Sequence, residues 1–113
     1  MMQSIWRIEY YKNQRGKEPV LDFIESLPVR SQTKVGASIK LLEELGIEIG
    51  APHVKKIFGT KIWELRILGE NSVRIFYISK VDRVFWLLHG FVKKSQKTPK
   101  NELLVALKRA DEI

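Results

Sequence analysis

The chain opens with a strand pattern and then changes to a helical one. Residues 4–11 alternate between apolar and polar side chains, the period of two that predicts a β-strand. From Pro19 the apolar side chains instead recur every three to four residues, which predicts a short helix that ends before Pro28. The same spacing continues from Ser31 to Leu45 and predicts a second helix, so we expect a helical hairpin in the first half of the chain.

The second half returns to strand patterns. The runs Lys61–Leu68, Val73–Ser79 and Arg83–Val92 are joined by short connections, which predicts three strands with sequential antiparallel pairing. An apolar stripe after Pro99 predicts a final helix, whereas residues 48–60 show no regular pattern. The expected fold is therefore α+β in the order β-α-α-β-β-β-α, a small antiparallel sheet with an N-terminal helical hairpin and a C-terminal helix.

The composition favours a single domain, residues 1–113, because the length and the 44% hydrophobic content are those of one globular unit. The chain has no cysteine, which excludes disulfides, thiolate metal sites and cysteine nucleophiles. No apolar run before Arg7 forms a signal-peptide core, and the longest such run, Val84–Leu88, is too short to span a membrane. We therefore expect a cytoplasmic protein with no membrane partner.

The net charge of +7 lies entirely in the second half. Residues 1–50 carry equal numbers of basic and acidic side chains, whereas residues 51–113 carry thirteen basic and six acidic ones. The excess is densest in Lys93–Lys100, which contains four lysines and no acid. Such an asymmetry favours a polyanionic partner, either a nucleic acid or an acidic protein.

Several familiar catalytic sites find no support in the sequence. The two histidines, His53 and His89, are far apart and have no carboxylates at metal-ligand spacing, so we expect no metal. The glycines form no phosphate-binding loop, and no serine lies in a nucleophile-elbow context. We therefore expect no cofactor.

Charged side chains on the predicted sheet form the remaining candidate site. Glu64 and Arg66 are two residues apart on one strand and therefore share a face, and Arg74 begins the next strand. Lys93 and Lys94 follow the last strand, so a meander could bring these side chains to one surface.

Such a surface suits RNA cleavage by the neighbouring 2′-hydroxyl, because guanidinium and ammonium groups stabilise the charge of the phosphorane without a metal. The reaction also needs a base, for which Glu64 and His89 are candidates, and an acid, for which a lysine or arginine is a candidate. Structural roles remain open for the same residues: Glu64 with Arg66 as an exposed ion pair, and His89 as a hydrogen-bonded core histidine. The further candidate RNA-binding residues are Lys55, Lys56, Lys61 and Lys97.

Three ordered blocks of the second half carry a resemblance to a known family. They are Ile62–Arg66, Val73–Tyr77 and Leu88–Pro99, and the opening Glu18–Ile24 is also typical. Together they resemble the phage-derived HigB-type toxins of type II toxin–antitoxin systems, which belong to the RelE/ParE superfamily. The resemblance covers nearly the whole chain and implies the same fold, a small antiparallel sheet flanked by helices.

The resemblance also implies a function: metal-independent endonucleolytic cleavage of mRNA, generally on the ribosome. The implied partner is a helix-turn-helix antitoxin (HigA-like) in a toxin–antitoxin hetero-oligomer. Arg74 matches the arginine of the family's Tyr-Arg-hydrophobic-hydrophobic-Tyr strand, and Lys93 or Lys94 matches the basic residue after the last strand. Arg66 matches one of two basic residues on the preceding strand, but Glu64 is acidic where the other stands.

Two other functions stay open at this point. A ParE-like toxin would poison DNA gyrase without cleaving RNA, since a shared fold does not determine function. An inactive relic would bind only its antitoxin or RNA. Arg74 and the lysine cluster favour the nuclease, because poisoning gyrase does not need them.

Overall fold

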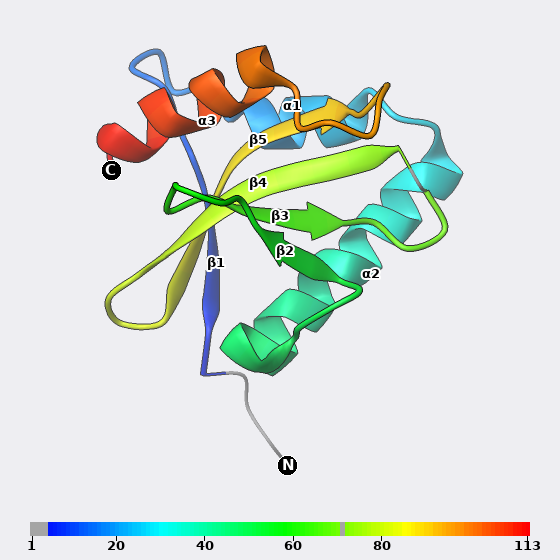
Figure 1. Ribbon diagram of the computed structural model, residues 1–113, viewed down its shortest axis with the longest axis horizontal. Coiled ribbons are helices and arrows are strands. Elements are labelled where there is room, and N and C mark those ends of the chain that lie inside the picture. The colour runs from blue at the N-terminus through cyan, green and yellow to red at the C-terminus, as the bar shows by residue number, and fades with distance from the viewer. Residues whose placement is uncertain (1–4, 71) are drawn as a thin grey trace.

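The computed structural model describes residues 5–70 and 72–113, so Ser4, in the first predicted strand, lies outside the described residues. Figure 1 shows a twisted sheet of five strands with helices on both of its faces. The elements in chain order are β1 (Arg7–Tyr10), α1 (Pro19–Glu25), α2 (Val29–Leu45), a 3-10 turn (Gly46–Glu48), β2 (Val54–Lys56), β3 (Trp63–Arg66), β4 (Val73–Lys80), β5 (Val84–Val92) and α3 (Lys100–Asp111). This arrangement confirms the α+β fold class.

The sheet differs from the prediction in two ways. Its strand order is β1-β5-β4-β3-β2, and β1 pairs with β5 in parallel, so the sheet is mixed and not wholly antiparallel. The chain between β1 and β5 is long and includes two α-helices and three strands, and it allows a parallel pairing that a tight turn would not. β2 arises within residues 48–60, which were expected to be irregular, because three residues are too few to show a periodic pattern.

The two N-terminal helices end where local chemistry requires it. Pro19 is the first residue of α1, where its missing N–H leaves no hydrogen bond unmade. Gly46 ends α2 with a φ of 60° and donates its N–H to the carbonyl of Leu42. A side chain there would also collide with Trp6, since a Cβ on Gly46 would lie 2.2 Å from the indole Nε1.

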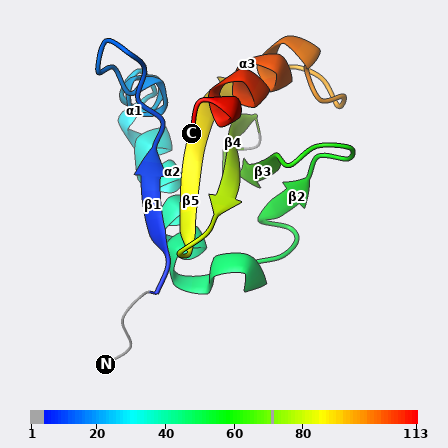
Figure 2. The ribbon, with the colours of Figure 1, turned by 90° about the vertical axis from the view of Figure 1, so that its left-hand side faces the viewer.

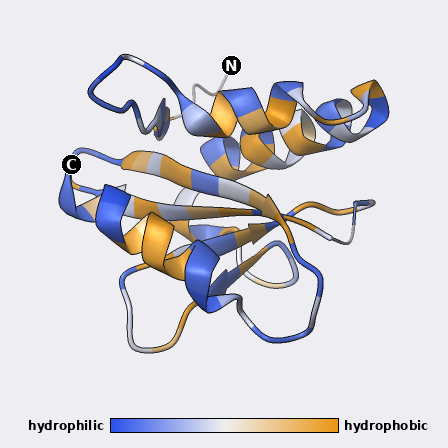
Figure 3. Ribbon diagram, turned by 90° about the horizontal axis from the view of Figure 1, so that it is seen from above, coloured by the Kyte–Doolittle hydropathy of each residue, from blue (hydrophilic) through white to orange (hydrophobic). Residues whose placement is uncertain are grey.

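The hydrophobic core has two layers, one on each side of the sheet. Ile75 and Tyr77 of β4 pack in the layer that includes residues of α1 and α2, whereas Phe76 and Ile78 pack in the layer that includes residues of α3. Figure 3 shows the hydrophobic strands between these two groups of helices. None of the helices in the described part of the chain has the length and apolar character of a membrane span.

A β-bulge interrupts the pairing of β4 with β5. Phe76 pairs with His89 and Tyr77 pairs with Leu87, which leaves Leu88 as an extra residue in β5. Leu88 therefore packs in the layer under α3, and His89 next to it also contacts α3. The bulge decides on which side of the sheet His89 lies.

We expect Gly90→Ala to destabilise the fold by about 1–3 kcal/mol, because it overpacks the contact between β5 and α1. A Cβ on Gly90 would lie 2.4 Å from Cδ2 of Phe23, which packs against the core. The matched control is Gly36→Ala in the exposed part of α2, where a Cβ would meet nothing within 4 Å. Urea unfolding should show a loss for the first variant and a neutral or stabilising effect for the second. Equal midpoints would contradict the prediction.

Candidate active site

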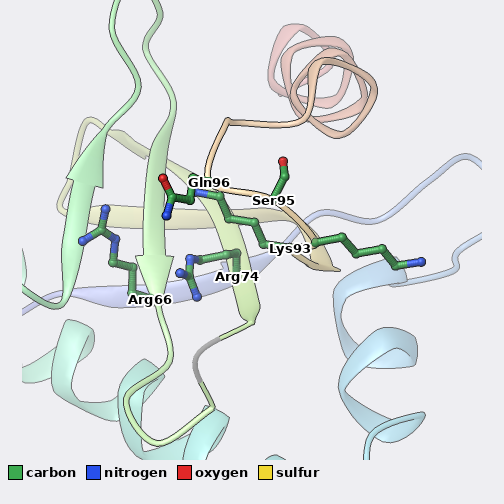
Figure 4. A pocket seen from close by; sticks show the side chains of 6 residues that line it. Arg66, Arg74, Lys93, Ser95 and Gln96 are labelled. Atoms are coloured by element: carbon green, nitrogen blue, oxygen red, sulfur yellow. The ribbon is translucent and has the colours of Figure 1, made fainter.

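A pocket of about 470 Å³ opens on the α3 side of the sheet, where β3 ends, β4 begins and the connection to α3 leaves β5. Figure 4 shows Arg66 and Arg74 on neighbouring strands, with Gln96 near them on the connection that leaves β5. Four of the six lining residues are basic and the other two are neutral and polar. The lining residues are Arg66, Arg74, Lys93, Lys94, Ser95 and Gln96. The structure thus brings together four of the residues that the sequence singled out.

The register of β3 and β4 places two like charges directly opposite each other. Arg66 pairs with Arg74, an arrangement that by itself is destabilising. Glu64 lies two residues before Arg66 on the same face, and its Oε1 is 3.4 Å from Nε of Arg66 and 3.6 Å from Nε of Arg74. One carboxylate is therefore shared by two guanidinium groups and offsets their repulsion.

Glu64 is buried, with only 1% of its surface exposed. The alternative of an exposed ion pair on the sheet surface is therefore wrong. The neighbours of Glu64 explain the burial, because it pairs with Phe76 on one side and with Lys55 of β2 on the other. Its Oε2 is buried without a hydrogen-bond partner among the described residues. A buried carboxylate is tolerated only beside compensating charge, which here comes from the two arginines.

Arg74 is held more tightly than Arg66. Its side chain is 15% exposed against 36% for Arg66, and its Nη1 donates to the carbonyl oxygen of Val73 at 3.0 Å. Burial lowers the pKa of Arg74, Glu64 raises it and Arg66 lowers it again. Arginine nevertheless keeps its proton in proteins, so the pocket holds a fixed, partly desolvated cation. Such a cation interacts strongly with an anion that enters the pocket.

The far side of the pocket comes from the segment after β5. The backbone N–H of Lys93 donates to the carbonyl of Ser72 at 2.6 Å, which ties this segment to the start of β4. Lys93 is half-buried and Lys94 is exposed. Ser95 and Gln96 complete the lining and were missed by the sequence reasoning, although their position beside the lysine pair is a usable signal.

His89 does not line the pocket. Its Nε2 lies 2.9 Å from Oε1 of Glu102 and its Nδ1 lies 3.2 Å from Nη1 of Arg109, both on α3, and its ring stacks on Phe91. Because an arginine only donates, Nδ1 accepts and Nε2 carries the proton toward Glu102. These contacts match the hydrogen-bonded structural alternative for His89 that the sequence left open.

Two of the four candidate RNA-binding lysines belong to segments that also carry or pair with residues of the site. Lys55 pairs with Glu64 across β2 and β3, so it shares the face of the pocket arginines, and it is exposed. Lys97 is exposed in the same connection as Gln96. Both remain candidates for contacts with phosphates next to the pocket.

The other two lysines contact protein groups. Lys56 lies on the opposite face, where its Nζ is 5.3 Å from the ring centroid of Trp63. Lys61 lies 3.6 Å from a carboxylate oxygen of Asp111, and both side chains are well exposed. Exposed pairs of this kind contribute little to stability, so Lys61 stays accessible to another anion.

The pocket can bind and stabilise an anion. Its lining supplies N–H and O–H donors, several of them charged, and these suit the oxygen atoms of a phosphate. Among residues 5–70 and 72–113, no group of three or more His, Asp or Glu side chains is placed to hold a metal ion. The described residues that line the pocket include no carboxylate or imidazole, and their side chains can stabilise negative charge and donate protons.

A comparison with known protein families found a family model that matches most of the chain. The family model described as "Phage derived protein Gp49-like (DUF891)" matches residues 22–111, which include all the residues that line the pocket. A search of the curated proteins found no match.

Proposed function

The chain belongs to the family of Gp49-like phage-derived proteins, and from this membership and the cationic pocket we propose that it is the toxin of a type II toxin–antitoxin system. The family is associated with RelE- and HigB-like toxins. The finer proposal is a HigB-type endoribonuclease that cuts mRNA on the ribosome and so blocks translation. Its partner would be a helix-turn-helix antitoxin encoded beside it.

The observation that carries the nuclease proposal is the pair of opposed guanidinium groups held by one buried carboxylate. Arg66 and Arg74 share Glu64 behind them and line the open pocket in front. Planar guanidinium groups bind phosphate oxygens in a bidentate manner. Their hydrogen bonds to these oxygens become stronger as negative charge develops on the oxygens. A scissile phosphate would occupy this position.

In the proposed reaction the 2′-oxygen attacks the phosphorus and loses its proton, while the bond to the 5′-oxygen breaks. The products are a 2′,3′-cyclic phosphate and a 5′-hydroxyl, so no metal-bound water is needed. Arg66 and Arg74 stabilise the extra negative charge of the phosphorane, and Lys93 or Lys94 protonates the 5′-oxygen that leaves. The buried Glu64 orients the arginines and does not contact the substrate.

The proposed site predicts a dependence on the ribosome. No exposed carboxylate or imidazole occurs among the described lining residues, so the proton of the 2′-hydroxyl passes to water or to a group of the ribosome. The protein then contributes charge stabilisation, positioning and the proton that Lys93 or Lys94 gives to the leaving oxygen, and the first two are large parts of many enzymatic rate enhancements.

The test compares translated with untranslated mRNA in a reconstituted translation system that contains the purified chain. We expect cuts within the translated reading frame, with 5′-hydroxyl ends, and none in the same mRNA without its start codon. Intact mRNA in a translating reaction would contradict the nuclease. Inhibition of DNA supercoiling in a parallel gyrase assay without ribosomes would identify the protein as a gyrase poison instead.

A further inference from the structure

Phe58 is the most exposed large hydrophobic residue in the described part of the chain, with 99% of its surface in contact with solvent. It lies in the turn between β2 and β3, which projects from the body of the molecule (Figure 2). Single exposed apolar residues are common on protein surfaces. The meaning of Phe58 therefore depends on how the turn is built and on what surrounds it.

The turn that carries Phe58 is ordered by its neighbours. Ile57 and Ile62 on either side are buried, and the N–H of Ile57 donates to the carbonyl of Ile62 at 3.0 Å. The hydroxyl of Thr60 donates to the carbonyl of Ile57 and accepts from the N–H of Ile62, at 2.9 and 3.0 Å. Because the flanking residues are anchored in the core, the aromatic ring is presented on a rigid support. Binding to it costs little ordering of the chain.

The surroundings of Phe58 are cationic. Residues 53–63 contain Lys55, Lys56 and Lys61 and no acidic residue. Lys55 is exposed on the face of the pocket arginines, as its pairing with Glu64 shows. Of these three lysines, Lys55 faces the same way as the pocket arginines, whereas Lys56 lies over Trp63 on the opposite face and Lys61 pairs with Asp111. An aromatic ring near exposed cations is the combination with which proteins bind single-stranded nucleic acids, where bases stack on rings and cations follow the backbone.

The hairpin formed by β2 and β3 also lies close enough to the pocket at Arg66 and Arg74 for one RNA strand to contact both. Figure 2 shows its turn projecting to the same side as the connection between β5 and α3, which supplies Lys93 and Lys94 to the pocket. Ile62 at the base of the turn lies four positions before Arg66, a distance of about 13 Å at the usual rise of a strand. A few nucleotides of extended single strand span that distance.

We propose that Phe58 is a stacking platform for an unpaired base of single-stranded RNA whose backbone runs from the β2–β3 hairpin into the pocket at Arg66 and Arg74. This inference rests on the proposed function in taking RNA as the ligand, and it adds that the substrate is single-stranded next to the cleaved bond. A base within a duplex is already stacked on both faces and is not available to the ring.

The test measures binding of the full chain to a 2′-O-methyl single-stranded RNA oligonucleotide, which lacks the attacking hydroxyl and therefore stays intact. Phe58→Ala should weaken binding by about 5- to 150-fold, the equivalent of 1–3 kcal/mol for one stacked base. Phe58→Trp should retain the affinity. Phe58→Leu should weaken it like alanine, because leucine keeps an apolar contact but has no ring to stack.

The matched control is Val81→Ala, which removes an 83% exposed apolar side chain from the turn between β4 and β5 and should bind RNA like the wild type. Thermal unfolding should show equal stability for all four variants, because both positions are exposed. Wild-type affinity in Phe58→Ala, or retained affinity in Phe58→Leu, would overturn the inference. An equal dependence on Phe58 for a duplex of the same sequence would overturn it too.

Two further outcomes distinguish a failure of the stacking proposal for Phe58 from a failure of the nuclease proposal. Binding that depends on an aromatic residue at position 58, without cleavage of translated mRNA by the wild type, would support the stacking role and overturn the nuclease. Weakened capture of the antitoxin by Phe58→Ala with unchanged RNA affinity would assign the ring to a protein contact and overturn the stacking role.

Discussion

Replacing Arg74 by alanine should lower the rate of mRNA cleavage by at least about 100-fold, the usual cost of removing one preorganised donor from a developing oxyanion. The side chain is fixed by Glu64 and by the carbonyl of Val73, and most of its surface is shielded from water. These contacts hold a cation at the position where the proposed reaction would develop the charge of the phosphorane. Cells that express Arg74→Ala should therefore continue to grow, whereas cells that express the wild-type protein should stop growing.

Two further variants make the Arg74 result specific. Arg74→Lys keeps the charge but loses the planar fork of donors, so it should cleave at an intermediate rate. Arg30→Ala removes an exposed arginine from α2 and should cleave like the wild type. Cleavage at the wild-type rate by a stably folded Arg74→Ala would remove Arg74 from the reaction and with it the proposed phosphate site.

Glu64→Ala should destabilise the protein by about 3 kcal/mol, because deleting one partner of a buried ion pair leaves the other charge uncompensated. Here two arginines would remain opposite each other across β3 and β4 without the carboxylate between them. Glu64→Gln keeps the shape and one oxygen acceptor, so we expect a smaller loss of stability, about 1–2 kcal/mol. Urea unfolding at neutral pH measures both losses.

Cleavage kinetics distinguish an orienting Glu64 from a catalytic base. If Glu64 only orients the arginines, Glu64→Gln should cleave more slowly but with the same dependence of the rate on pH as the wild type. If Glu64 removes the proton of the 2′-hydroxyl, the variant should lose the acidic limb of the pH profile and nearly all activity. A fully stable Glu64→Ala would show that the arginines do not need the buried carboxylate.

The sequence was most informative where structure is local. Period-two alternation identified the first strand, apolar-rich runs joined by short connections identified three more of the five, and the i, i+3, i+4 spacing identified all three α-helices. β2 was missed because it has three residues, and its role as a strand depends on its pairing with β3. The parallel pairing of β1 with β5 was missed because a strand's own pattern does not record which distant strand lies beside it.

The candidate site shows the same division. The spacing of Glu64 and Arg66 showed that they share a face, because side chains alternate along every strand. The position of Arg74 opposite Arg66 needed the register of β3 with β4, and the place of His89 needed the bulge at Leu88. Both the register and the bulge arise from pairing between separate segments, so they could not be read from either strand alone.

By itself the sequence determined the helices, most strands, the location of the excess positive charge after residue 50 and the resemblance to a toxin family. Only the tertiary structure decided where each of these side chains lies: Glu64 is buried beside two arginines, His89 is hydrogen-bonded to α3, and the aromatic ring of Phe58 is exposed. The physical reason is that periodicity and charge belong to a segment. Burial, by contrast, depends on which distant segments pack around a side chain, and it determines whether a charge supports the fold or faces a ligand.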